Sequence, residues 1–165
     1  MVAKYHDVTY TEDYIPTIFT DQKNLNVTVD GKTVKLYVND TGDSSQSAKN
    51  RKAFYDYINV FIVCFAINDK KSFDNAYEKW RSEIREVALK VPIILVGTKS
   101  DLRNDPGSAQ KLVSQQDAAD NVSSGYFSKY VECSTNQNSI NEVFETAARE
   151  YLAVKSKEGC GCDIL

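Results

Sequence analysis

The sequence lacks the features that mark secreted, metal-binding and membrane-spanning proteins. Its four cysteines, Cys64, Cys133, Cys160 and Cys162, have neither the spacing of a disulfide framework nor that of a zinc site. The longest near-uniform apolar run, Val60–Ile67, is far shorter than the roughly 20 residues that a membrane-spanning helix needs. The first residues also lack the basic region and apolar stretch of a secretory signal. We therefore expect a cytoplasmic protein with reduced thiols.

The chain has little excess charge of either sign. Its 20 basic and 23 acidic residues leave a net charge of -3, and no long stripe of lysine and arginine is present to follow a phosphate backbone. Nucleic acid is therefore not expected as a partner. With 165 residues, of which 42% are hydrophobic, the chain has the composition of one globular domain that buries about two-thirds of its unfolded surface.

Two kinds of strand pattern are present. Leu25–Val29 and Thr33–Val38 alternate apolar and polar residues on either side of Asp30 and Gly31, which predicts an antiparallel hairpin. Val60–Ile67 and Val91–Gly97 are continuous apolar runs, which is typical of parallel strands covered on both faces. The second pattern predicts helices on both sides of a sheet.

Helical patterns separate and follow these runs. Apolar residues at helical spacing predict a crossover helix over Ser72–Lys90 and a last helix over Ser139–Val154, with Ser139 or Asn141 as its cap. Between them lie a short strand, Tyr130–Cys133, and one loop-like region, Asn104–Gln116. This alternation of strands and helices predicts an open α/β sheet.

Thr98, Lys99, Ser100 and Asp101 follow the predicted strand Val91–Gly97, and Cys133, Ser134 and Thr135 stand at the end of the predicted strand Tyr130–Cys133. Both groups lie at the edge where open α/β sheets bind ligands. Alone, each group could be ordinary loop residues, but their order and spacing around the strands resemble the guanine-recognition motifs of Rho/Rac-type small GTPases. The resemblance implies that Asp101 accepts hydrogen bonds from guanine, that the Lys99 stem packs along the base, and that backbone N–H groups near Ser134 support it.

An upstream segment is similar to the effector segment of the same family. It comprises Tyr14, Ile15, Pro16, Thr17, Ile18, Phe19, Thr20, Asp21 and Gln22. The resemblance implies GTP or GDP and Mg²⁺ as cofactors, with Thr17 and Asp40 close to the metal. It places the remaining nucleotide contacts at Asp40, Thr41, Gly42, Asp43 and Ser44. The partners it implies are Rho/Rac-type effectors, exchange factors, activating proteins and dissociation inhibitors.

The chain departs from this family where the phosphates would bind. It contains no Gly-x-x-x-x-Gly-Lys-Ser/Thr loop, and the strand that precedes this loop in the family is missing too. Because that strand lies in the middle of the family's sheet, its neighbours must rearrange, leave unpaired edges or find another strand. Two explanations remain open: an N-terminal segment present in a longer parent, or a degenerate gene copy.

The residues that would act on the γ-phosphate have also changed. Asp43 stands where the family has a glycine that donates to the phosphate, and Ser44 is too short to orient water as the family's glutamine does. A shift of one residue would return Gly42 to the glycine position, but Asp43 would then replace the glutamine, which is no better. We expect weak GTP binding, little hydrolysis and no catalytic residue.

The C-terminus fits a lipidation signal. Cys162–Leu165 matches a C-a-a-X box, and a terminal leucine usually directs a geranylgeranyl group to the cysteine, although Asp163 is unusual at its position. A single lipid binds membranes reversibly, and Cys160 is a candidate for a second one, a palmitoyl group. The expected location is the cytoplasmic side of the cell membrane, with peripheral attachment to its inner leaflet.

Together these observations predict an α/β, Ras-like P-loop NTPase fold without its first strand, its phosphate-binding loop and most of its first helix. We expect an N-terminally incomplete GTPase-like domain over residues 1–154 and a flexible lipidated tail over 155–165. The predicted role is Rho/Rac-like signalling related to the actin cytoskeleton. One alternative is an interaction module that presents the effector segment without a nucleotide cycle, and another is an intact GTPase of which this sequence is a part.

Overall fold

The structure contains two separate sheets. The computed structural model describes residues 21–41, 45–105, 112–135 and 137–158. Within these residues, a two-stranded antiparallel sheet is followed by a three-stranded parallel sheet in the order β3-β4-β5. The strands are β1 (Asp21–Val29), β2 (Lys32–Asp40), β3 (Phe61–Ala66), β4 (Ile93–Thr98) and β5 (Lys129–Cys133). The predicted α/β class, with a mostly parallel sheet flanked by helices, is confirmed.

The hairpin forms as predicted because its turn suits a two-residue connection. Asp30 and Gly31 have φ angles of 53° and 73°, and Val29 pairs directly with Lys32 across the turn. Positive φ at both central residues gives the backbone twist that joins two antiparallel strands. Leu25 and its alternate neighbours along β1 are buried, and the residues between them are exposed. The hairpin therefore has one apolar face to pack against the rest of the protein.

The crossover between β3 and β4 is one helical run with a π-helical turn in its middle. It consists of α3 (Lys70–Asn75), η2 (Ala76–Arg81) and α4 (Ser82–Val87). The side chain of Asp69 caps its start by accepting a hydrogen bond from the backbone N–H of Ser72 at 3.2 Å. The predicted helix over Ser72–Lys90 is confirmed, and it begins two residues earlier and ends at Val87.

Several shorter helices have no clear signal in the sequence. They are α2 (Ser45–Phe54), η1 (Tyr55–Tyr57), η3 (Ser100–Asn104) and α5 (Gln115–Ser123). The predicted loop over Asn104–Gln116 is too long at both ends, because η3 includes Asn104 and α5 begins at Gln115. The Ser114 side chain caps α5 by accepting a hydrogen bond from the N–H of Asp117 at 3.0 Å. Ala118 is the buried residue of α5, so the helix lacks the wide apolar stripe on which helix prediction depends.

The last helix, α6 (Gln137–Glu158), holds the two sheets together. Its residues Ile140, Phe144 and Ala148 pack in one apolar cluster with the hairpin, while Val143 and Ala147 pack in another with β4 and β5. Both predicted caps, Ser139 and Asn141, are wrong because they lie inside the helix. None of the helices in the described ranges is long and apolar enough to cross a bilayer.

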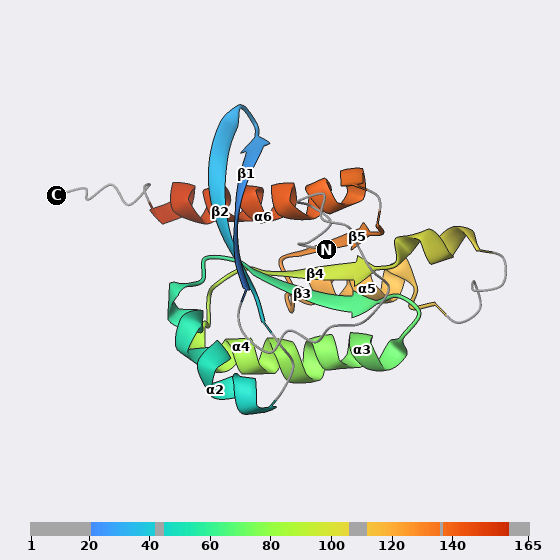
Figure 1. Ribbon diagram of the computed structural model, residues 1–165. Helices are drawn as coiled ribbons and strands as arrows, with labels where there is room; N and C mark the ends of the chain where they lie inside the picture. The colour runs from blue at the N-terminus through green and yellow to red at the C-terminus, as the bar shows by residue number, and fades with distance from the viewer. Residues whose placement is uncertain (1–20, 42–44, 106–111, 136, 159–165) are drawn as a thin grey trace.

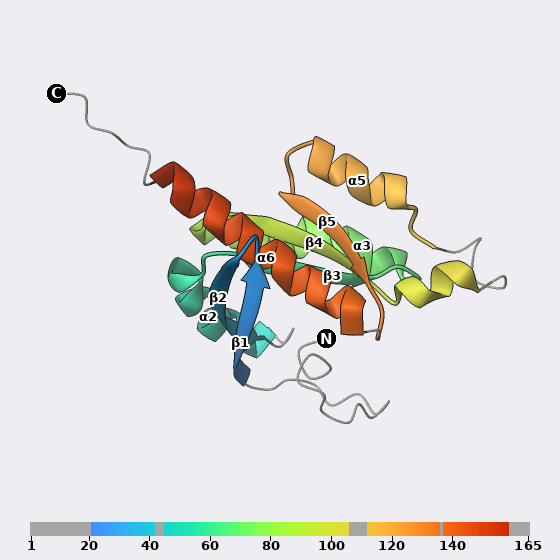
Figure 2. The same cartoon turned by 90° about the horizontal axis from the view of Figure 1, so that it is seen from above.

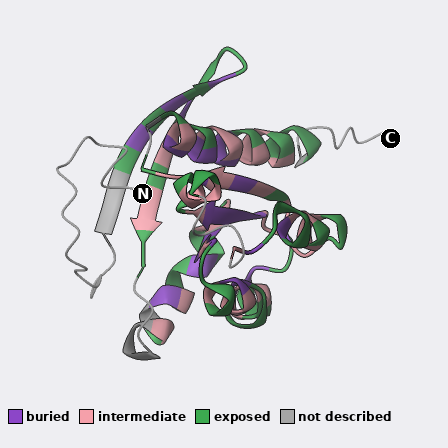
Figure 3. Ribbon diagram, turned by 90° about the vertical axis from the view of Figure 1, so that its right-hand side faces the viewer, coloured by how far each residue is buried: buried purple, intermediate pink, exposed green. Residues whose placement is uncertain are grey.

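Helices cover both faces of the parallel sheet (Figures 1 and 2). The crossover helix lies on one face and α6 on the other, with the hairpin beside α6. Buried residues gather in the strands between these layers (Figure 3), and Ile93–Val96 of β4 are fully buried. This core fixes the carboxyl ends of β4 and β5, where the sequence places its guanine-recognition motifs.

Candidate functional site

The two predicted base-recognition segments lie next to each other. Thr98, the last residue of β4, is the register partner of Cys133, the last residue of β5. The segments that follow these residues therefore leave the same edge of the sheet. This is the position at which open α/β sheets bind ligands.

The segment after β4 has an unusual backbone. Lys99 has φ 62° and ψ 36°, the left-handed conformation that residues other than glycine seldom adopt. The Lys99 carbonyl accepts from the N–H of Leu102 at 3.0 Å, and the Thr98 hydroxyl donates to the Phe65 carbonyl at 2.9 Å. The side chains of Lys99 and Asp101 are both exposed. The turn thus presents an ammonium group and a carboxylate to solvent from a backbone tied to β3.

The segment after β5 is anchored from inside. The Cys133 side chain is buried, and burial raises the pKa of its thiol, which keeps it neutral and suits packing better than nucleophilic chemistry. The N–H of Ser134 donates to the Ser139 hydroxyl at 3.1 Å. This bond uses a backbone donor that the family resemblance assigns to the base, and it holds the segment against the first turn of α6.

An ion pair braces the two segments against each other. Arg103 donates through Nε to Glu132 Oε2 at 2.6 Å, and its Nη2 donates to the other carboxylate oxygen. Tyr130 donates its hydroxyl to the same carboxylate, and Gln115 donates through Nε2 at 3.3 Å. Arg103 Nη2 also donates to the Val113 carbonyl at 3.0 Å. One carboxylate therefore connects η3, β5 and the start of α5.

The charges in this brace are stabilised by each other. Burial alone would raise the pKa of Glu132, but the hydrogen bonds from Arg103, Tyr130 and Gln115 outweigh it, and its pKa lies below the usual value. The same carboxylate raises the pKa of Arg103. The brace was not predicted from the sequence. The only hint of this ion pair in the sequence is that Arg103 and Glu132, which have opposite charges, each stand beside one of the two base-recognition segments.

Gly97 is packed so closely that a methyl group does not fit. A Cβ atom at this position would lie 2.8 Å from the Tyr130 hydroxyl oxygen and 3.0 Å from Ile67 Cγ2. Gly97→Ala should therefore lower the free energy of unfolding by about 1–3 kcal/mol, because Tyr130 must move away from Glu132. Chemical denaturation of the variant would measure this. An unchanged unfolding midpoint would show that Tyr130 moves without cost.

The phosphate-side residues are less completely placed. Asp40 and Thr41 lie at the end of β2 and line a cleft between the hairpin and β3. Asp21 and Gln22 belong to β1, where they pair with Asp40 and Asn39. The other predicted positions lie outside the described residues. They are residues 14–20 of the effector segment with Thr17, the nucleotide residues Gly42, Asp43 and Ser44, and the lipidation candidates Cys160 and Cys162.

The described residues at this edge fit a purine base. Asp101 offers an exposed carboxylate beside the rigid Lys99 turn, which suits a planar ligand with hydrogen-bond donors on one edge. Within residues 21–41, 45–105, 112–135 and 137–158, however, no three His, Cys, Asp or Glu side chains come together as a metal site. Of the two predicted Mg²⁺ contacts, Asp40 lies at the end of β2 and Thr17 lies outside the described residues.

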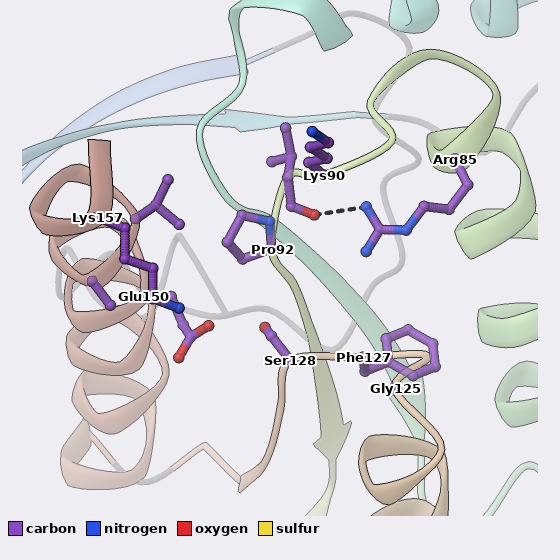
Figure 4. A pocket seen from close by; sticks show the side chains of 11 residues that line it. Arg85, Lys90, Pro92, Gly125, Phe127, Ser128, Glu150 and Lys157 are labelled. Atoms are coloured by element: carbon purple, nitrogen blue, oxygen red, sulfur yellow. Dashed lines mark hydrogen bonds between the residues drawn. The ribbon is translucent and has the colours of Figure 1, made fainter. Parts of the chain in front are cut away.

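A second pocket lies at the opposite end of the sheet (Figure 4). Its volume is about 420 Å³, and it is lined by residues that precede β4 and β5 and by the end of α6. Arg85 already donates to the carbonyls of Ala88 and Val91 at 2.9 and 2.7 Å. The pocket is therefore separate from the base-recognition edge, and its arginine is committed to the backbone.

Comparison with known proteins shows which family this chain resembles. The Ras family model matches residues 1–153. The chain is 39% identical over 158 residues to "GTP-binding protein RHO1" of Candida albicans, which covers 91% of this chain and 79% of that protein. It is 33% identical over 174 residues to "Rho-related protein racC" of Entamoeba histolytica, covering 100% and 89% respectively. It is also 37% identical over 152 residues to "GTP-binding protein rho5" of Schizosaccharomyces pombe, covering 87% and 76%.

Proposed function

Because this chain belongs to the Ras family, and within it to the Rho/Rac-like small GTPases, we propose that it acts in small-GTPase signalling through a site that recognises guanine but grips phosphate weakly. The observation that carries the proposal is the register of Thr98 with Cys133, which brings the two base-recognition segments to one edge. The brace between Arg103 and Glu132 supports it, because it fixes the spacing of these segments.

Each residue at this edge has a defined task. Asp101 accepts hydrogen bonds from the N1 and exocyclic amine of guanine, and the apolar stem of Lys99 packs along the ring. Thr98, whose hydroxyl is bonded to the Phe65 carbonyl, and Ser100 would lie against the base from the same turn, and the Ser134 segment would contact its other side. Bound nucleotide would supply the γ-phosphate by which this family distinguishes its two states.

We infer weak binding for the sequence as given, which contains no phosphate-binding loop. Backbone N–H groups and a lysine normally contact the phosphates as charge-assisted hydrogen bonds, each of which contributes about 1.5–3 kcal/mol. Since every 1.4 kcal/mol changes affinity tenfold, losing several such bonds weakens binding by about a thousandfold or more. Asp43 and Ser44 give no means of holding and orienting water, so we expect little hydrolysis.

The remaining parts of the proposal concern partners and location. The segment from Tyr14 to Gln22 would present the effector surface, and exchange factors, activating proteins and dissociation inhibitors are the regulators expected of this family. Cys162 would carry a geranylgeranyl group and Cys160 a palmitoyl group, which together would attach the protein to the cytoplasmic side of the cell membrane. Control of the actin cytoskeleton is the pathway we propose.

Asp101→Ala tests the base site directly. It should weaken binding of fluorescent GDP by about tenfold or more, because it removes an ionised acceptor of two hydrogen bonds. Binding is measured by fluorescence titration, and a thermal melt with and without GDP gives a second reading. Glu78→Ala is the matched control, because it removes an exposed carboxylate from the crossover helix, away from this edge.

Two outcomes would separate the proposal from its alternative. If unlabelled GDP competes with the probe and ATP does not, the base is read and the proposal stands. If neither nucleotide binds a chain that melts cooperatively, the protein is an interaction module that presents its effector segment without a nucleotide cycle. Equal binding by the Asp101→Ala variant would contradict the role of that carboxylate.

A further inference from the structure

The pocket at the end of the sheet opposite the base-recognition edge is lined by both apolar and charged residues (Figure 4). Its volume of about 420 Å³ falls within the range of about 300–1,000 Å³ that is usual for small-molecule sites. The larger apolar residues that line it are Val91, Pro92, Phe127 and Val154. The charged residues are Arg85, Lys90, Glu150 and Lys157. This lining matches a ligand that has both an apolar part and an ionised part.

The cations of this pocket have no carboxylate partner. None of the ion pairs formed within residues 21–41, 45–105, 112–135 and 137–158 involves Arg85, Lys90 or Lys157. Arg85 donates to two backbone carbonyls through Nη1 alone, so its Nε and Nη2 donors remain for another acceptor. The whole chain has a net charge of -3, yet the pocket has three cations and one carboxylate. Positive charge is therefore concentrated at one place on an acidic protein.

The electrostatics of Arg85 favour a bound anion. Burial and the nearby guanidinium of Arg81 lower the pKa of Arg85, which means that both disfavour its charged form. An anion held against Nε and Nη2 would offset both effects through charge-assisted hydrogen bonds. The planar guanidinium group suits phosphate oxygens in this way, because two parallel N–H donors meet two acceptors.

The charges divide the pocket into two sides. Arg85 and Lys90 come from the end of the crossover helix and the segment that follows it, and Glu150 lies across the pocket on α6 (Figure 4). The C-terminal end of α6 adds the negative end of a helix dipole to the Glu150 side. An anionic group would therefore lie beside Arg85 and Lys90, and an apolar group would extend towards Ala153 and Val154.

We propose that this pocket binds a phosphate monoester that carries an apolar group. Three cations and one carboxylate leave about two positive charges, and a phosphate monoester carries about -1.5 to -2 at pH 7. A carboxylate would neutralise about half of this charge. The monoester belongs either to a lipid headgroup or to a soluble organic phosphate, and the pocket recognises the same chemistry in both. The inference concerns a site apart from the base-recognition edge, and it depends on neither nucleotide binding nor lipidation.

Two probes and two controls provide the test on the full chain. 1-Naphthyl phosphate is the soluble probe, and dihexanoyl phosphatidate is the lipid probe. Inorganic phosphate carries only the anion, and 1-naphthol carries only the apolar group. Isothermal titration calorimetry gives the affinities, and amide chemical shifts in NMR spectra locate the site. Binding of either probe at this pocket supports the proposal, and the tighter of the two indicates the source of the phosphate.

The expected shifts lie at the residues that line the pocket. They should gather in residues 85–92, 125–128 and 150–157. Residues 98–105 and 132–135, which form the base-recognition edge, should be unaffected. Inorganic phosphate and 1-naphthol should each bind more weakly than 1-naphthyl phosphate, because each meets only one part of the lining.

Two substitutions should change the affinity in opposite directions. Lys90→Met should weaken binding of 1-naphthyl phosphate by about three- to tenfold, because it removes an exposed cation beside the phosphate. Glu150→Gln should strengthen binding by about twofold or more, because it removes the opposing carboxylate. Lys71→Met and Glu142→Gln make the same charge changes at exposed residues that do not line the pocket. Both controls should bind like the unmodified chain.

Four results would overturn the proposal. The first is no binding of either probe by a chain that melts cooperatively. The second is equal binding of 1-naphthyl phosphate and one of the two controls, which would show that the pocket does not recognise both parts of the ligand. The third is an equal effect of Lys90→Met and Lys71→Met, which would show a response to overall charge. The fourth is a set of shifts confined to residues 98–105 and 132–135, which would place the probe at the base-recognition edge.

Discussion

Glu83→Ala should lower the free energy of unfolding by about 3–5 kcal/mol, because it leaves a nearly buried guanidinium without its carboxylate. The side chains of Arg51 and Glu83 are 4% and 14% exposed. Arg51 donates through Nε and Nη2 to the two oxygens of Glu83, both at 2.9 Å, and Tyr55 donates to the same carboxylate at 2.6 Å. Urea denaturation followed by circular dichroism measures the loss.

A more exposed ion pair, Lys52–Glu86, is the matched control for the Arg51–Glu83 pair. Lys52 donates to Glu86 at 2.6 Å on the same two helices, but these side chains are 38% and 62% exposed. Glu86→Ala should therefore change stability by about 0–1 kcal/mol. Replacing Arg51 with methionine together with Glu83→Leu should recover much of the loss, since no charge then remains buried. Equal effects of Glu83→Ala and Glu86→Ala would contradict the importance of burial.

The same pair gives stability a dependence on pH. Burial alone would raise the pKa of Glu83, but hydrogen bonds from Arg51 and Tyr55 outweigh it, and its pKa falls below the ordinary value of 4.5. A carboxylate whose pKa is lowered by folding contributes stability above its unfolded pKa, and this contribution is lost as the pH falls through the folded pKa. Denaturation of Glu83→Gln should therefore depend less on pH below about 4.5 than that of the unmodified chain.

The elements predicted correctly are those whose information is local. The hairpin is visible because Asp30 and Gly31 stand between two alternating segments, and the turn conformation follows from these two residues. β4 is visible because Ile93–Val96 form an uninterrupted apolar run, which a strand covered on both faces requires. In both cases, neighbouring residues in the sequence determine the conformation.

The features that were missed depend on residues far apart in the sequence. α2 contains Arg51 and few apolar residues, so its buried face is recognised only once Glu83, 32 positions away, is placed beside it. Arg103 and Glu132 are 29 positions apart and meet only after β4 and β5 have paired. Ser139 looks like a cap, but its hydroxyl accepts from Ser134, which is outside the helix. No periodicity in the sequence contains this information.

The separation of the hairpin from the parallel sheet depends both on the local sequence and on packing between residues far apart in the sequence. The missing phosphate loop and first strand were evident from the sequence, and unpaired edges were one of three expected consequences. Within the described residues, the hairpin is joined to the parallel sheet through side-chain packing on α6. Side-chain packing on one helix can hold two sheets together without strand pairing, because apolar burial does not require a particular hydrogen-bonding direction.

Glu132→Ala should have the second large effect, lowering the free energy of unfolding by about 2–4 kcal/mol. The side chains of Arg103 and Glu132 are 22% and 13% exposed, so the loss should be smaller than for the Arg51 pair. The carboxylate also accepts from Tyr130 and Gln115, which lose a partner at the same time. Glu145→Ala is the control, because its pair with Arg149 is more exposed and lies within one helix.

The same substitution tests whether the brace serves the base site. Glu132 does not itself lie in the predicted contact set, so any effect on ligand binding must pass through the positions of the two segments it connects. Hydrogen exchange at residues 99–105 and 112–115 should rise in Glu132→Ala, and GDP binding should weaken even under conditions in which the variant is fully folded. Glu132→Gln keeps the shape of the side chain and should show a smaller change in both. Weaker binding without faster exchange would instead place Glu132 in contact with the ligand.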